Sequence, residues 1–183
     1  ARSPGDDPLA IWRATEAAGL AVSCIGTMEQ LADPAFEALV AQVTALPIML
    51  EHSAGLARPD FVDDEGTRQR LAGLARLPNV YLKLSPIGQL EPRLPLFPVS
   101  GRPLEAGPRA TAACNLAAAF GASRCLWSSD FPMVSSREGY GNALSWSRAL
   151  YEPVLGIDGL GDAAAAPLGL ACHRLTLERE MDD

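Results

Sequence analysis

The sequence predicts an α/β fold in which four parallel strands alternate with helices. Short apolar runs alternate along the chain with longer stretches whose apolar residues recur at helical spacing. Proline or glycine stands at most of the changeovers, where it ends a helix or a strand. The runs are apolar at successive positions, which is typical of strands that are covered on both faces in a parallel sheet. Helices between the strands would supply that cover through right-handed crossovers.

Two helix–strand units are predicted in the first part of the chain. Asp6-Asp7-Pro8 predicts the start of the first helix, because a carboxylate can cap a helix and proline suits its first turn. Residues 20–25 form the first predicted strand. Asp33-Pro34 begins a second helix in the same way, and its apolar spacing continues to Leu46-Pro47, where proline ends it. Residues 48–52 are the second predicted strand.

Two more units follow the same plan. Residues 71–77 have the apolar spacing of a third helix, and residues 80–84 form the third predicted strand. Residues 85–107 are rich in proline, and their length predicts a binding loop or lid. Residues 108–120 predict a fourth helix. Residues 125–129 predict a fourth strand, which begins as a short uncharged run and ends in two serines before an aspartate.

Helices are also predicted after the fourth strand. Ser135-Ser-Arg-Glu138 has the spacing of a capping box and predicts a helix that carries residues 140–146. Residues 168–178 predict a last helix. The whole order makes either a small open sheet or half of a (β/α)8 barrel, which typically takes about 250 residues. We expect one domain that spans residues 1–183.

The composition argues against several classes of partner. A net charge of −7 disfavours nucleic acid and anionic membrane surfaces, and no apolar run is long enough to span a bilayer. Four widely spaced cysteines without a C-x-x-C pair indicate a reducing compartment, so we expect a cytoplasmic protein. Lys83 is the only lysine among 15 basic residues, so its position is expected to need an ammonium group. The chain opens on Ala1, so we expect a processed or partial chain.

Polar side chains mark the ends of three predicted strands: His52, Lys83 and Asp130. The carboxyl ends of neighbouring parallel strands meet at one edge of a sheet, so we expect these side chains to converge on one pocket. Side-chain alternation places His52 on the same face as Ile48 and Leu50. Each residue also has a plainer interpretation: a hydrogen-bonded core histidine, a lysine that extends to solvent, and an aspartate that bonds its own turn.

Three segments resemble the amidohydrolase-2 group of the amidohydrolase superfamily: LPIMLEHSAG at residues 46–55, LPNVYLKLS at residues 77–85 and FGASRCLWSSDFP at residues 120–132. The resemblance extends over most of residues 8–178, and Ser-Asp-Phe-Pro is its most specific part. It implies strands five to eight of a metal-dependent TIM barrel, which is the C-terminal half. In the family, the histidine that matches His52 is a metal ligand or substrate contact. The aspartate that matches Asp130 binds the metal and acts as the general base.

The chain departs from the family pattern at two places. The His-x-His ligand pair of the family's first strand does not occur in the sequence, and a further family histidine falls where this chain has Cys24-Ile25-Gly26. His52 and Asp130 are two ligands, whereas a catalytic zinc site usually has three from the protein. We therefore expect a divalent metal, zinc or manganese, to bind weakly or not at all. Some lactonases of the family work without metal, so these departures are compatible with hydrolysis.

The resemblance implies a hydrolase that acts on a small lactone, amide or carboxylic acid substrate. Asp130 would deprotonate a water molecule and His52 would polarise the carbonyl. Lys83 and Arg137 would bind a substrate carboxylate. Decarboxylation is an alternative reaction, and a non-catalytic half-barrel module is an alternative of another class. Four strands leave open edges at residues 20–25 and 125–127, so we expect a homo-oligomer or a partner chain.

Overall fold

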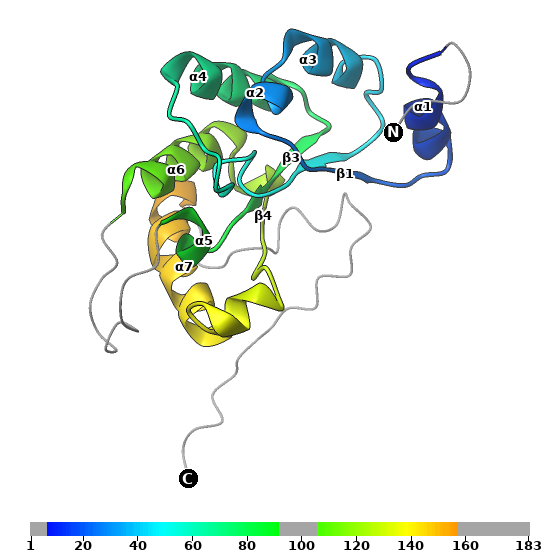
Figure 1. The fold of residues 1–183 in the computed structure, drawn as a ribbon. Coiled ribbons are helices and arrows are strands. Elements are labelled where there is room, and N and C mark those ends of the chain that lie inside the picture. Colours follow the sequence, from blue (N-terminus) through cyan, green and yellow to red (C-terminus); the bar gives the residue numbers. More distant parts are fainter. Residues whose placement is uncertain (1–6, 92–105, 157–183) are drawn as a thin grey trace.

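The computed structural model describes residues 7–91 and 106–156 of the 183-residue chain (Figure 1). Three predicted features lie wholly or partly outside the described residues: the Asp6 end of the first helix cap, most of the proline-rich loop, and the helix at residues 168–178. All four predicted strands lie inside the described part.

The described residues form one parallel sheet in which the strand order follows the chain order. Its strands are β1 (Val22–Cys24), β2 (Ile48–Leu50), β3 (Val80–Leu84) and β4 (Cys125–Trp127). One row of the register joins Cys24, Leu50, Leu82 and Cys125. The predicted parallel α/β fold is therefore confirmed, and β1 and β4 are the two edges of the sheet.

Three strands are shorter than predicted, because the chain leaves the extended conformation early. β2 stops at Leu50, and His52 already has a φ of 54°. β4 stops at Trp127, and Asp130 has a φ of 57°. A positive φ is incompatible with a strand and is uncommon for residues other than glycine. The chain turns directly after β2, and the candidate residues His52 and Asp130 lie beyond the ends of the shortened strands.

Helices connect the strands and pack on the sheet. In the described residues they are α1 (Ala10–Ala17), α2 (Met28–Leu31), α3 (Pro34–Val40), α4 (Glu65–Gly73), α5 (Ile87–Leu90), α6 (Pro108–Phe120) and α7 (Tyr140–Leu155). The predicted start of α3 is confirmed, since Asp33 Oδ1 accepts a hydrogen bond from Ala35 N at 2.7 Å and proline follows the cap. The fourth predicted helix coincides with α6.

Two predictions about helix ends are wrong. α3 stops at Val40 instead of Leu46, because the chain then forms tight turns whose carbonyls at Val43 and Leu46 accept hydrogen bonds from the buried side chain of Asn79. The capping box at residues 135–138 does not form. Residues 133–136 make a 3-10 turn and Gly139 precedes α7.

Two short helices were not predicted. α2 begins with a capping box in which Thr27 and Gln30 exchange hydrogen bonds between side chain and backbone. α5 lies inside the segment predicted as a loop, directly after Ser85-Pro86. Both follow the carboxyl end of a strand, so they border the edge of the sheet where the candidate residues lie.

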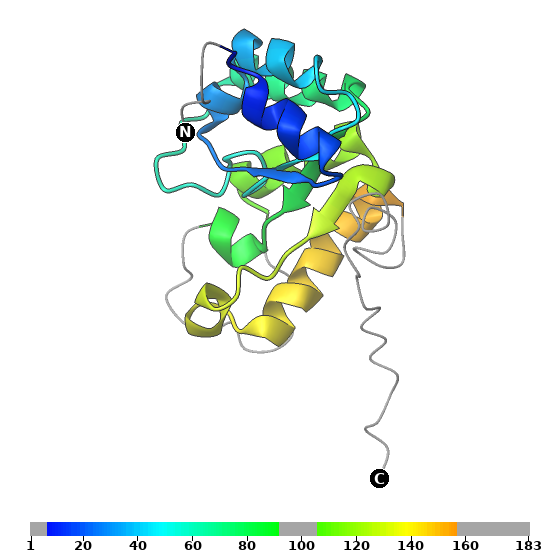
Figure 2. The ribbon, with the colours of Figure 1, turned by 90° about the vertical axis from the view of Figure 1, so that its right-hand side faces the viewer.

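The main core lies between the sheet and the layer of α3, α4, α6 and α7 (Figure 1 and Figure 2). Its strand residues, among them Ile48, Leu50, Leu82 and Leu84, are fully buried. Burying a side chain of this size contributes about 2 kcal/mol relative to leaving it exposed. This one-sided core gives the strands fixed positions.

The opposite face of the sheet is mixed, so the prediction of strands apolar on both faces is wrong there. Met49, Tyr81 and Leu126 form a small apolar cluster. By strand alternation the same face carries Ser23 and Lys83.

No helix in residues 7–91 and 106–156 has both the length and the apolar character needed to cross a bilayer.

Candidate active site

The carboxyl ends of β2, β3 and β4 bring the predicted site residues to one edge of the sheet. His52 is the second residue after β2, Lys83 is the penultimate residue of β3, and Asp130 is the third residue after β4. Backbone hydrogen bonds hold these segments side by side. Ser53 N donates to the Lys83 carbonyl at 2.9 Å, and Ser128 N donates to the Leu84 carbonyl at 3.1 Å.

A left-handed turn follows β2 and sets the position of His52. His52, Ser53 and Ala54 have φ angles of 54°, 51° and 55°, and Gly55 has 86°. Such angles cost free energy in residues with a Cβ, so surrounding contacts must hold the turn. The fully buried Ser53 supplies one, because its Oγ accepts a hydrogen bond from Ser85 N at 2.9 Å. Because β2 ends at Leu50, strand alternation does not determine whether His52 lies on the same face as Ile48 and Leu50, and that placement stays a prediction.

His52 is hydrogen-bonded to Gln89 of α5. Gln89 Nε2 lies 2.9 Å from Nδ1 of the ring. An amide nitrogen donates, so Nδ1 accepts and the neutral ring carries its proton on Nε2. In this arrangement Nε2 is a hydrogen-bond donor, which suits contact with a carbonyl oxygen. Ligation of a metal through Nε2 would require the amide of Gln89 to present its oxygen to the ring instead.

Lys83 forms an ion pair with Glu51 on the mixed face of the sheet. Its ammonium lies 2.8 Å from Glu51 Oε2 and 3.2 Å from Oε1. Ser23 donates to the same carboxylate, with Oγ 2.6 Å from Oε1. The Glu51 side chain is 8% exposed and the Lys83 side chain 30%. Lys83 therefore reaches a carboxylate instead of extending freely to solvent.

Asp130 is paired with Arg137, which bridges two carboxylates. Arg137 Nη1 lies 2.9 Å from Asp130 Oδ2, and Arg137 Nε lies 2.7 Å from Oε2 of Glu138. The Glu138 side chain is 4% exposed. Burial alone lowers the pKa of Arg137, but the hydrogen bonds to Glu138 and Asp130 outweigh this effect and raise the pKa. The guanidinium therefore stays charged between the two acids.

The structure brings the site residues to one edge but does not join them. Within the described residues, no hydrogen bond or ion pair links the side chains of His52, Lys83 and Asp130 to one another. In the same residues no group of three or more histidine, cysteine or acidic side chains could hold a metal ion. Burial and the nearby Glu51 raise the pKa of Cys24 to about 11, which disfavours the thiolate form that binds a metal. Convergence on one pocket stays a prediction.

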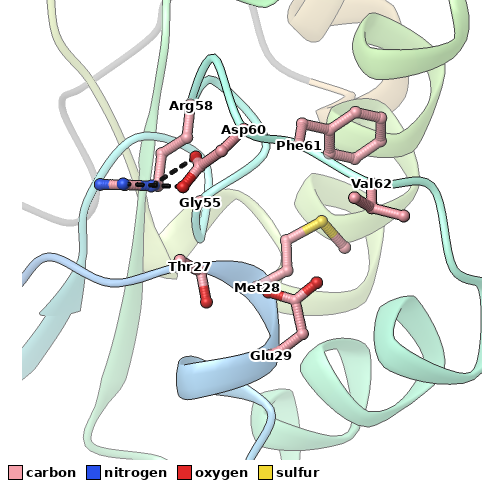
Figure 3. A pocket seen from close by; sticks show the side chains of 8 residues that line it. All are labelled: Thr27, Met28, Glu29, Gly55, Arg58, Asp60, Phe61 and Val62. Carbon is pink, nitrogen blue, oxygen red and sulfur yellow. Dashed lines mark hydrogen bonds and ion pairs between the residues drawn. The ribbon is translucent and has the colours of Figure 1, made fainter.

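A shallow hollow lies close to this edge but belongs to other residues (Figure 3). Thr27, after β1, and Gly55, after β2, contribute to its wall, and Arg58 is paired with Asp60 beside it at 2.9 Å. The space inside is about 170 Å³ even with its open mouth, below the roughly 300–1,000 Å³ of ligand pockets. It is not a substrate pocket by this measure.

The comparisons with known proteins give a consistent result. The family model Amidohydro_2, described as amidohydrolase, matches residues 1–165. An amidohydrolase 2 from Bifidobacterium longum subsp. infantis has a TM-score of 0.62 at 22% identity, over 88% of this chain and 54% of that one. An amidohydrolase from Burkholderia multivorans, crystallised with HEPES, has a TM-score of 0.67 at 22% identity, over 90% and 58%. No curated protein matches the sequence.

A crystal structure of a Burkholderia multivorans amidohydrolase with bound zinc also matches, with a TM-score of 0.64 at 22% identity over 90% of this chain and 58% of that one. The chain therefore spans little more than half the length of the solved structures that it matches. At this identity the likeness shows the fold alone. The four parallel strands with their flanking helices correspond to part of an amidohydrolase TIM barrel.

Proposed function

This chain belongs to the amidohydrolase family, and from that premise we propose that it forms the C-terminal half of the barrel of a hydrolase. The proposed substrate is a small molecule with a lactone or amide bond. The observation that carries the proposal is Asp130, a half-buried carboxylate held by Arg137 at the carboxyl end of a barrel strand. Catalytic groups of TIM barrels lie at this end of the strands.

Asp130 is the proposed general base. Arg137 occupies Oδ2, and Oδ1 makes no hydrogen bond to the part of the chain that the structure describes. Oδ1 can therefore accept a proton from an attacking water molecule. His52 is the proposed electrophile, because the proton on its Nε2 can be donated to the substrate carbonyl while Gln89 holds Nδ1.

Lys83 and Arg137 are both expected to bind a substrate carboxylate, but we propose that only Lys83 contacts it. Lys83 has three N–H groups, and its contacts with the two oxygens of Glu51 leave one for a substrate. Arg137 is already engaged with Asp130 and Glu138, which favours a positioning role over the direct substrate contact expected from the resemblance.

The described residues do not fit a complete divalent metal site. Gln89 takes Nδ1 of His52, Arg137 takes one oxygen of Asp130, and no third ligand accompanies them within the described residues. Zinc or manganese would need ligands from elsewhere in the assembled protein. The proposed roles of Asp130 and His52 therefore use no metal.

We further propose that a second copy or a partner chain can supply strands for a closed barrel. The matched structures are longer than this chain, and both edges of its sheet are open in the described part.

The incomplete ligand set also favours a second candidate function, a non-catalytic half-barrel module. Cys24, Cys114 and Cys125 are free, which supports a reducing, cytoplasmic location.

The test is a hydrolysis assay of the purified chain against a panel of γ- and δ-lactones and small amides, with and without added zinc or manganese. Asp130→Asn should lower kcat/KM by at least about 100-fold, because the proton acceptor is lost. Asp60→Asn removes an exposed, ion-paired aspartate that is not among the proposed site residues and is the matched control. Turnover that survives Asp130→Asn would reject the assignment of the base. Release of carbon dioxide from carboxylic acids in the same panel would instead indicate a decarboxylase.

A further inference from the structure

The short helix α5 has a fixed position at the candidate site. Its first and last residues, Ile87 and Leu90, are 1% and 0% exposed. The hydroxyl of the buried Tyr151 in α7 donates to the carbonyl of Ser85, directly before the helix, at 3.1 Å. Because both ends are buried and one is tethered to α7, the two middle residues of α5 can hold other side chains in place.

We propose that these middle residues, Gly88 and Gln89, position the two candidate catalytic side chains, His52 and Asp130. The inference rests on the proposed function, since His52 and Asp130 are catalytic only if the chain is a hydrolase. Gly88 and Gln89 act through neighbouring side chains and are therefore positioning residues.

Gln89 acts on His52 directly. The 2.9 Å contact between Gln89 Nε2 and His52 Nδ1 is the side-chain hydrogen bond that the ring makes with the described residues. Without it the ring could hold its proton on either nitrogen and rotate about its bonds. With it, the donor Nε2 is left free for a substrate.

Gly88 acts on Asp130 through a partly buried chain of charges, formed by Glu138 and Arg137. A Cβ at Gly88 would overlap the carboxylate of Glu138, so glycine leaves the space which that carboxylate fills. Glu138 accepts from Nε of Arg137 at 2.7 Å, and Nη1 of the same guanidinium holds Asp130 at 2.9 Å. A displaced Glu138 would shift Arg137 and release Asp130.

Displacing the Glu138 carboxylate would cost free energy, although a glutamate side chain is flexible. The Glu138 side chain is 4% exposed, so moving it breaks a charge-assisted hydrogen bond in a site poorly reached by water. The backbone next to it is also held, because Asn142 Nδ2 donates to the Glu138 carbonyl at 2.9 Å. Gly88 thus constrains the orientation of Arg137 through the Glu138 carboxylate.

The Gln89 contact is tested by NMR spectroscopy of the full chain carrying His173→Gln, which leaves His52 as the single histidine. Gln89→Glu replaces the donor with a carboxylate that only accepts, so Nδ1 should become protonated. Long-range proton–nitrogen spectra separate the two ring nitrogens. Gln42→Glu, at an exposed glutamine bonded to the Ala38 carbonyl, is the control and should leave the proton on Nε2. The same protonation pattern in the wild type and Gln89→Glu would overturn the role of Gln89.

The Gly88 contact is tested by the Nε–H signal of Arg137, identified by its loss in Arg137→Lys. Gly88→Ala should shift or abolish this signal, because Glu138 must move. Gly73→Ala is the control, since a Cβ at this helical glycine would stay 3.6 Å from its nearest neighbour, an arginine Nη1. If Gly88→Ala does not fold, Glu138→Gln removes the charged acceptor without adding an atom at Gly88 and should also shift the signal. An unchanged signal in the folded variant would overturn the role of Gly88.

These readouts require no turnover, so the two hypotheses fail separately. A chain that hydrolyses a lactone but keeps both signals unchanged would retain the proposed function and lose the role of α5. A chain whose signals respond as expected but which hydrolyses nothing would retain the positioning network and lose the proposed reaction.

Discussion

The ammonium of Lys83 lies 2.8 Å from Oε2 of Glu51, across neighbouring strands on the mixed face of the sheet. Lys83 belongs to β3 and Glu51 directly follows β2, so the pair ties β3 to the end of β2. A buried charge without a partner costs several kcal/mol, and each member of the pair removes that cost for the other. This explains how the one lysine of the chain is accommodated in a central strand.

Removing Lys83 should therefore destabilise the fold. We expect Lys83→Met to lower the free energy of unfolding by about 2 kcal/mol, because Glu51 keeps its charge and loses its partner. The loss stays below that of a fully buried pair because Lys83 is partly exposed to water. Urea denaturation measures it. Combining Lys83→Met with Glu51→Leu should recover part of the loss, since no unpaired buried charge remains.

Arg148→Met provides the control for this pair. It removes an exposed contact with Glu152 on α7, 3.1 Å long and one helical turn apart. Such pairs contribute about 0.5 kcal/mol or less. Equal losses for Arg148→Met and Lys83→Met would contradict a structural role for the Lys83–Glu51 pair.

Gly55→Ala should strongly destabilise the turn that carries His52. The new Cβ would lie 2.8 Å from Met28 N and 2.9 Å from the Gly26 carbonyl oxygen, and the residue would keep a positive φ. We expect a loss of at least about 3 kcal/mol in thermal or urea unfolding. Gly19→Ala isolates the backbone contribution, because Gly19 has a φ of 66° and open space around it. Gly19→Ala should lower the free energy of unfolding by about 1 kcal/mol. An equal loss for Gly55→Ala would show that the backbone shifts enough to relieve the overlap of the new Cβ with Met28 N and the Gly26 carbonyl.

Zinc and manganese should give no tight one-to-one site on the isolated chain. His52 and Asp130 are each engaged with another side chain, and no third ligand completes a set within the described residues. Calorimetric titration at low micromolar protein measures this directly. A tight site would point first to Cys24, whose thiol would have to lose its proton despite a pKa raised to about 11.

The isolated chain should associate instead of remaining a stable monomer. Within residues 7–91 and 106–156, the edge strands β1 and β4 pair with another strand on one side only, and apolar side chains flank them. Ile25 is 66% exposed next to β1, and Phe131 is 74% exposed after β4. Light scattering at low micromolar concentration should show a dimer or larger species.

A charged substitution beside an edge strand distinguishes association by strand pairing from unspecific association. Ile25→Lys should shift the chain towards the monomer, because a lysine beside an edge strand opposes pairing. Val62→Lys replaces a similarly exposed residue, at 64%, that belongs to neither edge strand, and it should change little. A monodisperse wild-type monomer with cooperative unfolding would indicate that the four-stranded sheet is self-sufficient.

Most of the fold could be predicted because local signals and tertiary packing agree. The Asp33-Pro34 helix start, the 108–120 helix and the parallel order all follow from caps, periodicity and apolar runs. The predictions fail where a residue distant in the sequence determines the local structure. The α3 helix ends early at a turn whose carbonyls are satisfied by Asn79, more than 30 residues away. Periodicity within one segment carries no information about such a partner.

The site could be predicted only in part for the same reason. The strand-end positions of His52, Lys83 and Asp130 follow from the strand order, but their partners do not. Glu51 could have been identified, because the parallel register places it beside Lys83. Gln89 and Glu138 gave no such signal. One lies in a segment that resembled a loop, and the other resembled the end of a capping box.

The agreement between strand order and chain order has a consequence for synthesis on the ribosome. Among the four strands of the described residues, none is inserted between two earlier ones, so each new strand can add to an edge that already exists. Val22 pairs with Ile48 across a connection that contains α2 and α3, and Leu82 pairs with Cys125 across a longer one that contains α5 and α6. The sheet can therefore grow in the order in which the chain emerges, and its growing edge is open at every stage until another strand covers it.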